Sequence, residues 1–206
     1  MTQTSGAPAH KERLSRGQRL RRLLTSVCDP RAWAHVVKIV NYYNYAHVTP
    51  LRSIRVGRNP SISPNVAFAN PERISIGDNV RLGVRCMIWA GPARGRVVIG
   101  DDVMFGPEVM ITASSYRYDD GQPVTDQAMD EADVVIGNDV WIGTRAVLLP
   151  GARIGDGAII AAHAVVRGEV PAMAVAAGTP ARVVAQRVIG GADKAERDLP
   201  GSPEKT

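Results

Sequence analysis

The main pattern in the chain is an aliphatic residue that recurs every six positions, often with glycine directly after it. A period of six matches neither an amphipathic helix nor an alternating strand. One inward side chain per repeat, with a turn at the following glycine, predicts short flat strands, three to a coil, stacked into a prism. The repeated positions are Val56, Ile62 and Phe68; Ile76, Leu82 and Ile88; Ile99, Phe105 and Ile111; and Ile136, Ile142, Leu148, Ile154, Ile160 and Val166.

These repeats divide the chain into three segments. The expected organisation is a basic helical segment at 1–53, an all-β prism at 54–187 and a disordered polar tail at 188–206. About five coils at a strand spacing of ~4.8 Å give a prism on the order of 24 Å long. A long loop at 112–133 interrupts the repeats after the third coil. Because the ends of such a prism expose unpaired strand edges, the N-terminal helices are expected to cap one of them.

The N-terminal segment combines leucines with basic residues in two expected helices, one from His10 to Val27 and one from Arg31 to about Asn44. Residues 1–60 hold 11 of the 25 Lys and Arg but only 2 of the 20 Asp and Glu. A basic amphipathic segment of this kind suits contact with an anionic membrane surface. The preferred interpretation is a solvated face on a capping helix. Nothing resembles a nucleic-acid recognition motif, so no nucleic-acid partner is expected.

Composition limits the classes of protein to consider. Hydrophobic residues at 45% and charged residues at 22% indicate a globular protein, and 20 Gly with 14 Pro indicate many turns. The apolar runs are too short to cross a bilayer, and no secretory signal is recognisable, so a cytoplasmic protein is expected. Cys28 and Cys86 have no metal-binding spacing.

Three stretches carry a resemblance to a known family. They are IGDDVMFGPEVMIT (99–112), VVIGNDVWIGTRAVLLPGARIGDGAII (134–160) and VAAGTPARVV (175–184). With the repeats, they resemble the hexapeptide-repeat acyltransferases, in the branch of galactoside, maltose and envelope-polysaccharide O-acetyltransferases. This resemblance spans about 54–187 and implies a left-handed parallel β-helix. It also implies a homotrimer with acetyl-CoA bound in grooves between neighbouring prisms, and no metal.

The resemblance also assigns residues that contact the acyl donor. Trp141, Thr144 and Ala162 match positions along the pantetheine arm. Arg182 matches a basic residue near the phosphates of CoA, where a guanidinium group suits bidentate contacts. Where relatives have a Thr-Lys pair beside the 3′-phosphate, this chain has Arg167 and Gly168, and Arg167 supplies the positive charge. The zinc site of the carbonic anhydrases that share this fold needs three His, which the repeats lack.

At the catalytic position the sequence departs from the family. Relatives have a His early in the long loop as general base, and the alignment puts Tyr116 there. Since the phenol of Tyr has a pKa of about 10, it is a poor base at neutral pH. The same alignment puts Glu108 where relatives have an Asn that contacts the acceptor. Glu108 and Tyr116 are therefore the catalytic candidates, with the loop carboxylates Asp119 and Asp120 as further acceptor-site candidates.

Repeat geometry adds a candidate acceptor site. Positions three after the repeat residues of one face form a column of Arg85, Glu108, Arg145 and His163, with neighbours ~5 Å apart. One interpretation is an inert ladder of surface ion pairs. In the other, Arg85 and Glu108 help bind the acceptor, and the two Arg hold Glu108 ionised but weakly basic.

Three functional hypotheses remain open at this point. The leading one is a CoA-dependent O-acetyltransferase acting on a sugar or sugar-like molecule. The second is N-acetylation of an amino sugar, for which a missing base matters less. The third is a catalytically silent trimer that binds CoA or serves as an assembly partner.

Overall fold

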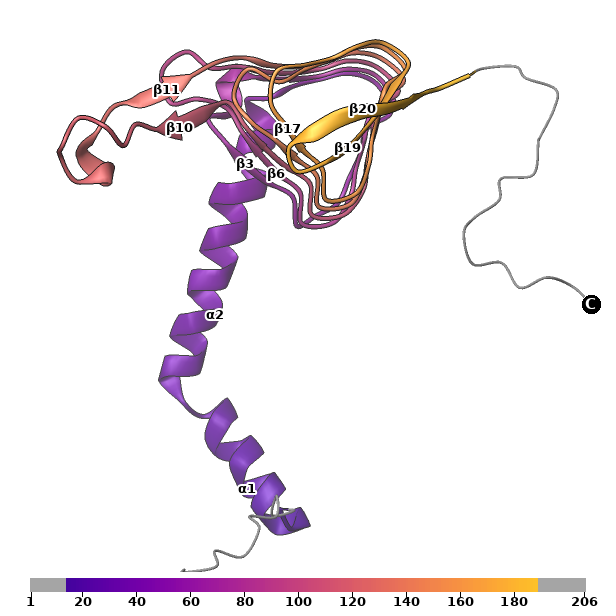
Figure 1. The fold of residues 1–206 in the computed structure, drawn as a ribbon. Helices are drawn as coiled ribbons and strands as arrows, with labels where there is room; N and C mark the ends of the chain where they lie inside the picture. Colours follow the sequence, from indigo (N-terminus) through magenta and orange to yellow (C-terminus); the bar gives the residue numbers. More distant parts are fainter. Residues whose placement is uncertain (1–13, 189–206) are drawn as a thin grey trace, which may run out of the picture. The chain divides into compact units, whose positions relative to one another are not determined.

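The computed structural model describes residues 14–188, so the expected tail beyond 188 and Lys11 and Arg13 of the basic segment lie outside the described residues. The chain forms two compact units, with the boundary between Tyr42 and Tyr43. The first contains α1 (Arg16–Val27) and most of α2 (Pro30–Tyr43), and the second contains the prism (Figure 1). None of the residues of α1 and α2 is buried.

The second unit is a left-handed parallel β-helix of triangular cross-section, as expected (Figure 1). Its three faces are sheets of parallel strands, here called faces A, B and C in the order in which each coil visits them. Face A holds β1 (Arg55–Val56), β4 (Ile74–Ile76), β7 (Val97–Ile99), β12 (Val134–Ile136), β15 (Arg153–Ile154) and β18 (Glu169–Val170). Face B holds β2 (Ser61–Ile62), β5 (Arg81–Leu82), β8 (Met104–Phe105), β13 (Trp141–Ile142), β16 (Ile159–Ile160) and β19 (Ala174–Gly178). Face C holds β3 (Ala67–Ala69), β6 (Met87–Trp89), β9 (Met110–Thr112), β14 (Val147–Leu148) and β17 (Val165–Val166).

Five complete coils are followed by a partial sixth, so the expected number of coils is confirmed. The last strand of face B, β19, turns back as the antiparallel strand β20 (Ala181–Gln186) and covers the end of that face. In parallel register, each inward aliphatic residue stacks on its counterpart in the next coil, for example Leu82 on Phe105 and Phe105 on Ile142. These residues form one buried core along the axis of the prism.

The corner between faces A and B is fixed by a side-chain ladder. Oδ1 of Asp78 accepts the backbone N–H of Arg58 at 2.7 Å, and Asp101 does the same for Asp78. Asn138 and Asp156 continue the ladder in the next coils. The residue before each ladder position is glycine, because a Cβ on Gly77 would lie 2.6 Å from the carbonyl oxygen of Gly100.

The segment that covers the start of the prism begins only after α2. It comprises the π-helical turn η1 (Asn44–Val48) and the 3₁₀ turn η2 (Pro50–Arg52). Nδ1 of His47 lies 2.7 Å from the carbonyl oxygen of Val66, and its ring packs 6.0 Å from that of Phe68. The contacts that cover the start of the prism come from residues 44–52, within the second unit. That α1 and α2 cap the prism stays a prediction.

The interruption after the third coil is a hairpin. It pairs β10 (Ser114–Tyr116) with β11 (Met129–Glu131) and projects from the corner between faces C and A (Figure 1). The 3₁₀ turn η4 (Val124–Asp126) lies near its tip, and another, η3 (Pro71–Arg73), precedes β4. Within the described range, no helix has the length and apolar character needed to cross a membrane.

Candidate active site

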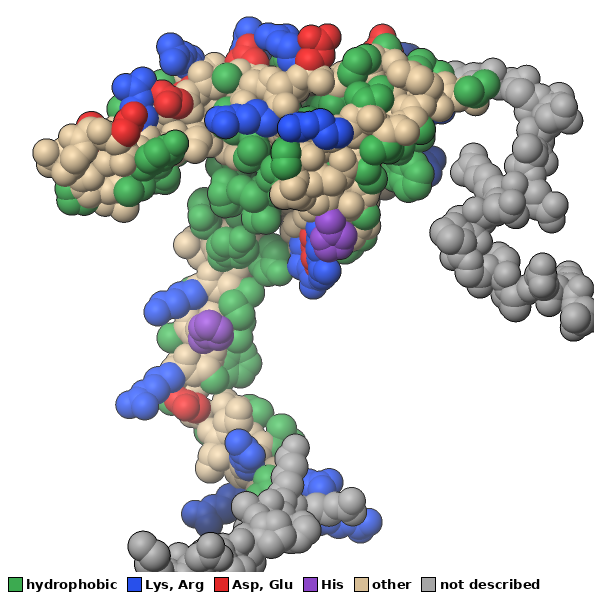
Figure 2. Space-filling view, viewed as in Figure 1, with side chains coloured by type: hydrophobic (Ala, Val, Ile, Leu, Met, Phe, Trp, Pro, Cys, Tyr) green, Lys and Arg blue, Asp and Glu red, His purple; other side chains and the backbone are tan. Residues whose placement is uncertain are grey.

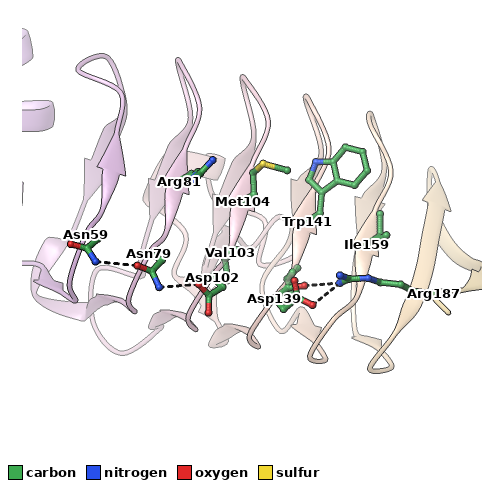
Figure 3. Close-up of a pocket in the computed structure, with 11 residues that line it drawn as sticks. Asn59, Asn79, Arg81, Asp102, Val103, Met104, Asp139, Trp141, Ile159 and Arg187 are labelled. Atoms are coloured by element: carbon green, nitrogen blue, oxygen red, sulfur yellow. Dashed lines mark hydrogen bonds and ion pairs between the residues drawn. The ribbon is translucent and has the colours of Figure 1, made fainter. Parts of the chain in front are cut away.

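A groove of about 620 Å³ runs along face B (Figure 3). Its floor is made by the residues that directly precede the inward aliphatic residues of successive strands. Such residues alternate with the core positions, so their side chains point outward. They are Arg81, Met104, Trp141 and Ile159. Trp141 remains 48% exposed, so its indole ring is available to a ligand lying in the groove.

Polar side chains form the border of the groove at the corner between faces A and B. Nδ2 of Asn59 donates to Asn79 at 3.3 Å, and Nδ2 of Asn79 donates to Asp102 at 2.9 Å (Figure 3). At the far end, Nη1 of Arg187 lies 2.8 Å from Oδ2 of Asp139 and also contacts two backbone carbonyl oxygens. The groove thus offers an apolar and aromatic floor, with Arg81 toward one end and the Arg187–Asp139 ion pair at the other.

The expected column of charged residues stands at the other edge of face B, at its corner with face C. Nε of Arg145 donates to Oε2 of Glu108 at 2.5 Å, and Arg85 donates to Oε1 of the same carboxylate. Both guanidinium groups are mostly exposed, whereas the Glu108 side chain is only 22% exposed. The adjacency predicted for Arg85, Glu108 and Arg145 is confirmed, and His163 follows one coil beyond Arg145.

The backbone of this column is in an unfavourable conformation. Arg85, Glu108, Arg145 and His163 all have φ near +60°. At the corner between faces A and B, five of the six residues with positive φ are Asn, Asp or Gly, which tolerate this region. For other residues it costs roughly 1–2 kcal/mol. The four long side chains are therefore kept at this corner against local backbone preference, which is typical of a functional site.

The other residues expected to contact the acyl donor on this side of the prism lie next to the column. Thr144 and Ala162 each directly precede a column residue, Arg145 and His163. Oγ1 of Thr179 donates to the carbonyl oxygen of His163 at 3.2 Å, which ties the end of the column to the turn between β19 and β20. Arg182 is exposed on β20, at the end of face B.

Tyr116 and Arg167 lie at a different corner, between faces C and A. Tyr116 is on β10 of the hairpin with 49% of its surface exposed, and Arg167 follows β17. Glu108 precedes β9 and Tyr116 follows it, so the two catalytic candidates stand at opposite ends of one face. Within one chain, the structure does not bring Tyr116 together with Glu108, nor Arg167 with Trp141.

The loop carboxylates lie at the tip of the hairpin and are exposed. Oδ1 of Asp120 accepts the backbone N–H of Gln122 at 2.9 Å, so this carboxylate shapes the turn, and Asp119 is its neighbour. Gln127 is buried beneath the tip and donates to the carbonyl oxygen of Gln122 at 2.7 Å. The hairpin therefore holds Tyr116, Asp119 and Asp120 on one ordered arm.

The base of that arm is anchored by Glu131. Its carboxylate accepts the backbone N–H groups of Ala93, Arg94 and Gly95, the last two at 2.6 Å. These hydrogen bonds to the charged form hold the pKa of Glu131 below its usual range, the one from Gly95 most strongly. Nearby, Arg96 pairs with Asp133 at 2.9 Å and lowers the pKa of that carboxyl group as well.

Sequence reasoning identified Trp141 but missed the rest of the groove floor and Arg187. A signal for the floor was present, because Arg81, Met104 and Ile159 occupy the same repeat position as Trp141. Arg187 gave no such signal, since it follows the last repeat. Among residues 14–188, no group of three or more His, Cys, Asp or Glu is placed to hold a metal ion.

Two family models match the chain. Residues 133–168 match the bacterial transferase hexapeptide model (six repeats), and residues 73–91 match the hexapeptide repeat of succinyl-transferase. Both matches fall on coils of the prism.

Similar proteins are known in sequence and in structure. A probable acetyltransferase of Mycobacterium tuberculosis is 36% identical over 144 residues, which are 68% of this chain and 47% of that protein. This chain thus spans about half the length of that relative. The galactoside O-acetyltransferase of Escherichia coli is 29% identical over 189 residues, or 84% of this chain and 88% of that protein. The solved structure of a galactoside acetyltransferase in complex with coenzyme A superposes with a TM-score of 0.61 at 26% identity, over 76% of this chain and 81% of that one.

Proposed function

We propose that this chain, which belongs to the hexapeptide-repeat acetyltransferase family, transfers the acetyl group of acetyl-coenzyme A to a hydroxyl group of a sugar or sugar-like acceptor. The observation that carries this proposal is the groove on face B, with Trp141 on its floor, together with the charged column at the corner between faces B and C. The relatives named above suggest the same class of reaction.

The groove suits the acyl donor. Met104, Trp141 and Ile159 offer an apolar strip for the pantetheine arm. Thr144 and Ala162, which directly precede Arg145 and His163, lie beside the charged column. Exposed arginines suit the phosphates, because a guanidinium group contacts phosphate oxygens in a bidentate manner. Arg81 lies in the groove and Arg182 on β20, whereas Arg187 is already paired with Asp139.

The reaction joins the acceptor oxygen to the carbonyl carbon of the thioester. As the new C–O bond forms and the C–S bond breaks, the hydroxyl group loses its proton and coenzyme A leaves as the thiol. Both oxygens of Glu108 already accept from arginines, but a carboxylate has about four lone-pair sites, so two remain for an acceptor hydroxyl group. In this proposal Glu108 orients the hydroxyl group and accepts its hydrogen bond, Arg85 flanks the acceptor, and Asp119 and Asp120 approach it from a hairpin.

A complete site of this kind needs a second copy of the chain. Tyr116, Asp119, Asp120 and Arg167 belong to the corner and hairpin between faces C and A, and Glu108 and Trp141 to face B and its edge. We propose a homotrimer in which the hairpin and corner of one protomer face the groove of the next. A closed ring of three prisms produces three equivalent heterologous contacts of this kind.

Mixing two impaired variants tests both the site and its composition. Trp141→Ala combined with Glu108→Gln impairs the groove half, and Tyr116→Phe combined with Arg167→Ala impairs the corner half. If each site joins two protomers, co-refolding the variants in equal amounts restores about a quarter of the sites, because random assembly pairs two intact halves at that frequency. Acetyl transfer to a panel of sugars is measured with acetyl-CoA. No recovery, with each variant folded and trimeric, would place all of these residues in one chain and overturn the shared site.

N-acetylation of an amino sugar is the second candidate, and one observation favours it. Glu108 is paired on both oxygens and Tyr116 is a weak base, whereas an unprotonated amine attacks a thioester with less help. The same panel, extended to amino sugars, separates the two reactions by product. Binding of CoA without transfer to any acceptor would instead support a silent assembly protein.

A further inference from the structure

The apolar sides of α1 and α2 are exposed in this chain. Leu20, Leu23, Leu24 and Val27 of α1 are each 54–60% exposed, and Trp33 of α2 is 59% exposed. Apolar and basic side chains both reach the surface of these helices (Figure 2). Helices of 12 and 14 residues are marginally stable in water by themselves, so their stability depends on packing the apolar side against something.

The arrangement of charge on α1 indicates what covers it. At 3.6 residues per turn the four apolar residues share one side, and Arg19 and Arg21 lie near its two borders, with Arg22 on the opposite side. Arg16, the first residue of the helix, lies on the apolar side itself. Arginine stems at the borders of an apolar stripe cover hydrophobic surface while their guanidinium groups reach out to polar headgroups. This pattern is typical of a helix that lies in the interface of a membrane.

The two helices form one basic element. Nε1 of Trp33 donates to the carbonyl oxygen of Val27 at 2.8 Å, which joins the start of α2 to the end of α1. Between them, Asp29 is the only acidic residue from 14 to 71, and its Oδ1 accepts the backbone N–H of Arg31 at 2.9 Å. The covering surface is therefore expected to be anionic as well as apolar.

We propose that α1, with the start of α2, anchors the protein to the surface of an anionic membrane. Leu20, Leu23, Leu24 and Val27 enter the boundary between headgroups and acyl chains, and the arginines of α1 bind the lipid phosphates. The anchor lies along the surface, consistent with the absence of a helix long enough to cross it among the described residues. It does not depend on the transferase reaction, since it uses none of the groove or corner residues.

Vesicle flotation with the full-length protein tests the anchor. We expect binding to vesicles with about 30% phosphatidylglycerol in phosphatidylcholine, weak binding to pure phosphatidylcholine, and release by high salt. Replacing Arg16, Arg19 and Arg21 together by Gln should weaken binding by about fivefold per charge. The matched control replaces three exposed arginines of the prism, Arg55, Arg94 and Arg153, by Gln and should leave vesicle binding largely intact.

A second variant tests the apolar stripe. Leu20→Ser, Leu23→Ser and Leu24→Ser together should abolish stable binding. In a protein whose other two tryptophans are replaced, by Trp89→Phe and Trp141→Phe, the fluorescence of Trp33 should shift to the blue when vesicles are added. Adding the three Leu→Ser substitutions to this protein should abolish the shift. Equal binding to neutral and anionic vesicles, or equal loss in the prism control, would overturn the proposal. If the Leu variant instead breaks the oligomer in sedimentation while vesicle binding is unchanged, α1 covers a second copy of the chain and the membrane proposal is wrong.

Discussion

Nε of Arg145 lies 2.5 Å from Oε2 of Glu108, although 37 residues separate them in the sequence. Arg85, one coil on the other side, holds the second oxygen of the same carboxylate. The three side chains form a ladder across three successive coils, and all three positions have a positive φ. A negative charge is thus placed between two positive ones at the corner between faces B and C, where it can orient an acceptor.

Glu108→Gln tests this assignment against Tyr116→Phe. If Glu108 binds the acceptor hydroxyl group, the amide should reduce turnover by about 10²-fold while the affinity for CoA changes little. Tyr116→Phe should then have a small effect. Steady-state kinetics with the acceptor found in the panel, together with calorimetry of CoA binding, measures both quantities.

The opposite result has its own signature. If the phenol of Tyr116 takes the proton, Tyr116→Phe is the damaging change and Glu108→Gln has the small effect. With an amine acceptor, neither substitution is severe. Wild-type turnover of both variants on a hydroxyl acceptor would exclude both residues and direct attention to Asp119 and Asp120 on the hairpin.

Trp141→Ala should weaken CoA binding by about tenfold or more, because it removes the largest apolar surface from the groove floor. The matched control is Trp89→Ala, which removes a partly exposed Trp from β6 on face C instead. Calorimetric titration with CoA compares the two. Equal weakening by both variants would show that the groove on face B is not the donor site.

The core of this protein could be predicted from the sequence because one structural rule repeats. Each coil places Leu82, Phe105 and their counterparts in the same inward position, so a period of six is enough to identify them. The column at Glu108 followed from the same rule, because strand spacing fixes how far apart successive corners lie. The groove floor could have been predicted in the same way, because its residues occupy the same repeat position as Trp141.

The features that sequence reasoning missed do not repeat in this way. The antiparallel return of β20, which brings Arg187 back to Asp139, occurs once, after the last repeat. The anchoring of Glu131 depends on the conformation of residues 93–95, which no periodicity encodes. The place of Tyr116, away from Glu108, depends on the hairpin of β10 and β11, which also occurs once.

Gly143→Ala should destabilise the prism, because a Cβ at this position would lie 2.5 Å from the backbone nitrogen of Ala162 in the next coil. The backbone there cannot move without breaking the strand register, so we expect a cost of roughly 1–3 kcal/mol. Gly17→Ala is the control, since nothing lies within 4 Å of its Cβ position and alanine favours a helix. Thermal unfolding of the two variants should differ by several degrees, and equal midpoints would contradict the close stacking of coils at this corner.

Glu131 should make stability depend on pH in the acid range. Its pKa is lowered in the folded protein by the N–H groups of Gly95, Arg94 and Ala93, whereas in the unfolded chain it is about 4.3. A carboxyl group whose pKa is lower in the folded state contributes its full stabilisation above the unfolded value, and loses it as the pH falls through the folded value. Glu131→Gln should therefore lower the unfolding temperature at pH 7, because a neutral amide accepts these hydrogen bonds less strongly. The gap between the variant and the wild type should narrow below about pH 4, where the wild-type carboxyl group becomes protonated too. Unfolding temperatures measured from pH 3 to pH 8 give the two curves, and a gap that stays constant over this range would show that the hydrogen bonds to the Glu131 carboxylate do not anchor the hairpin.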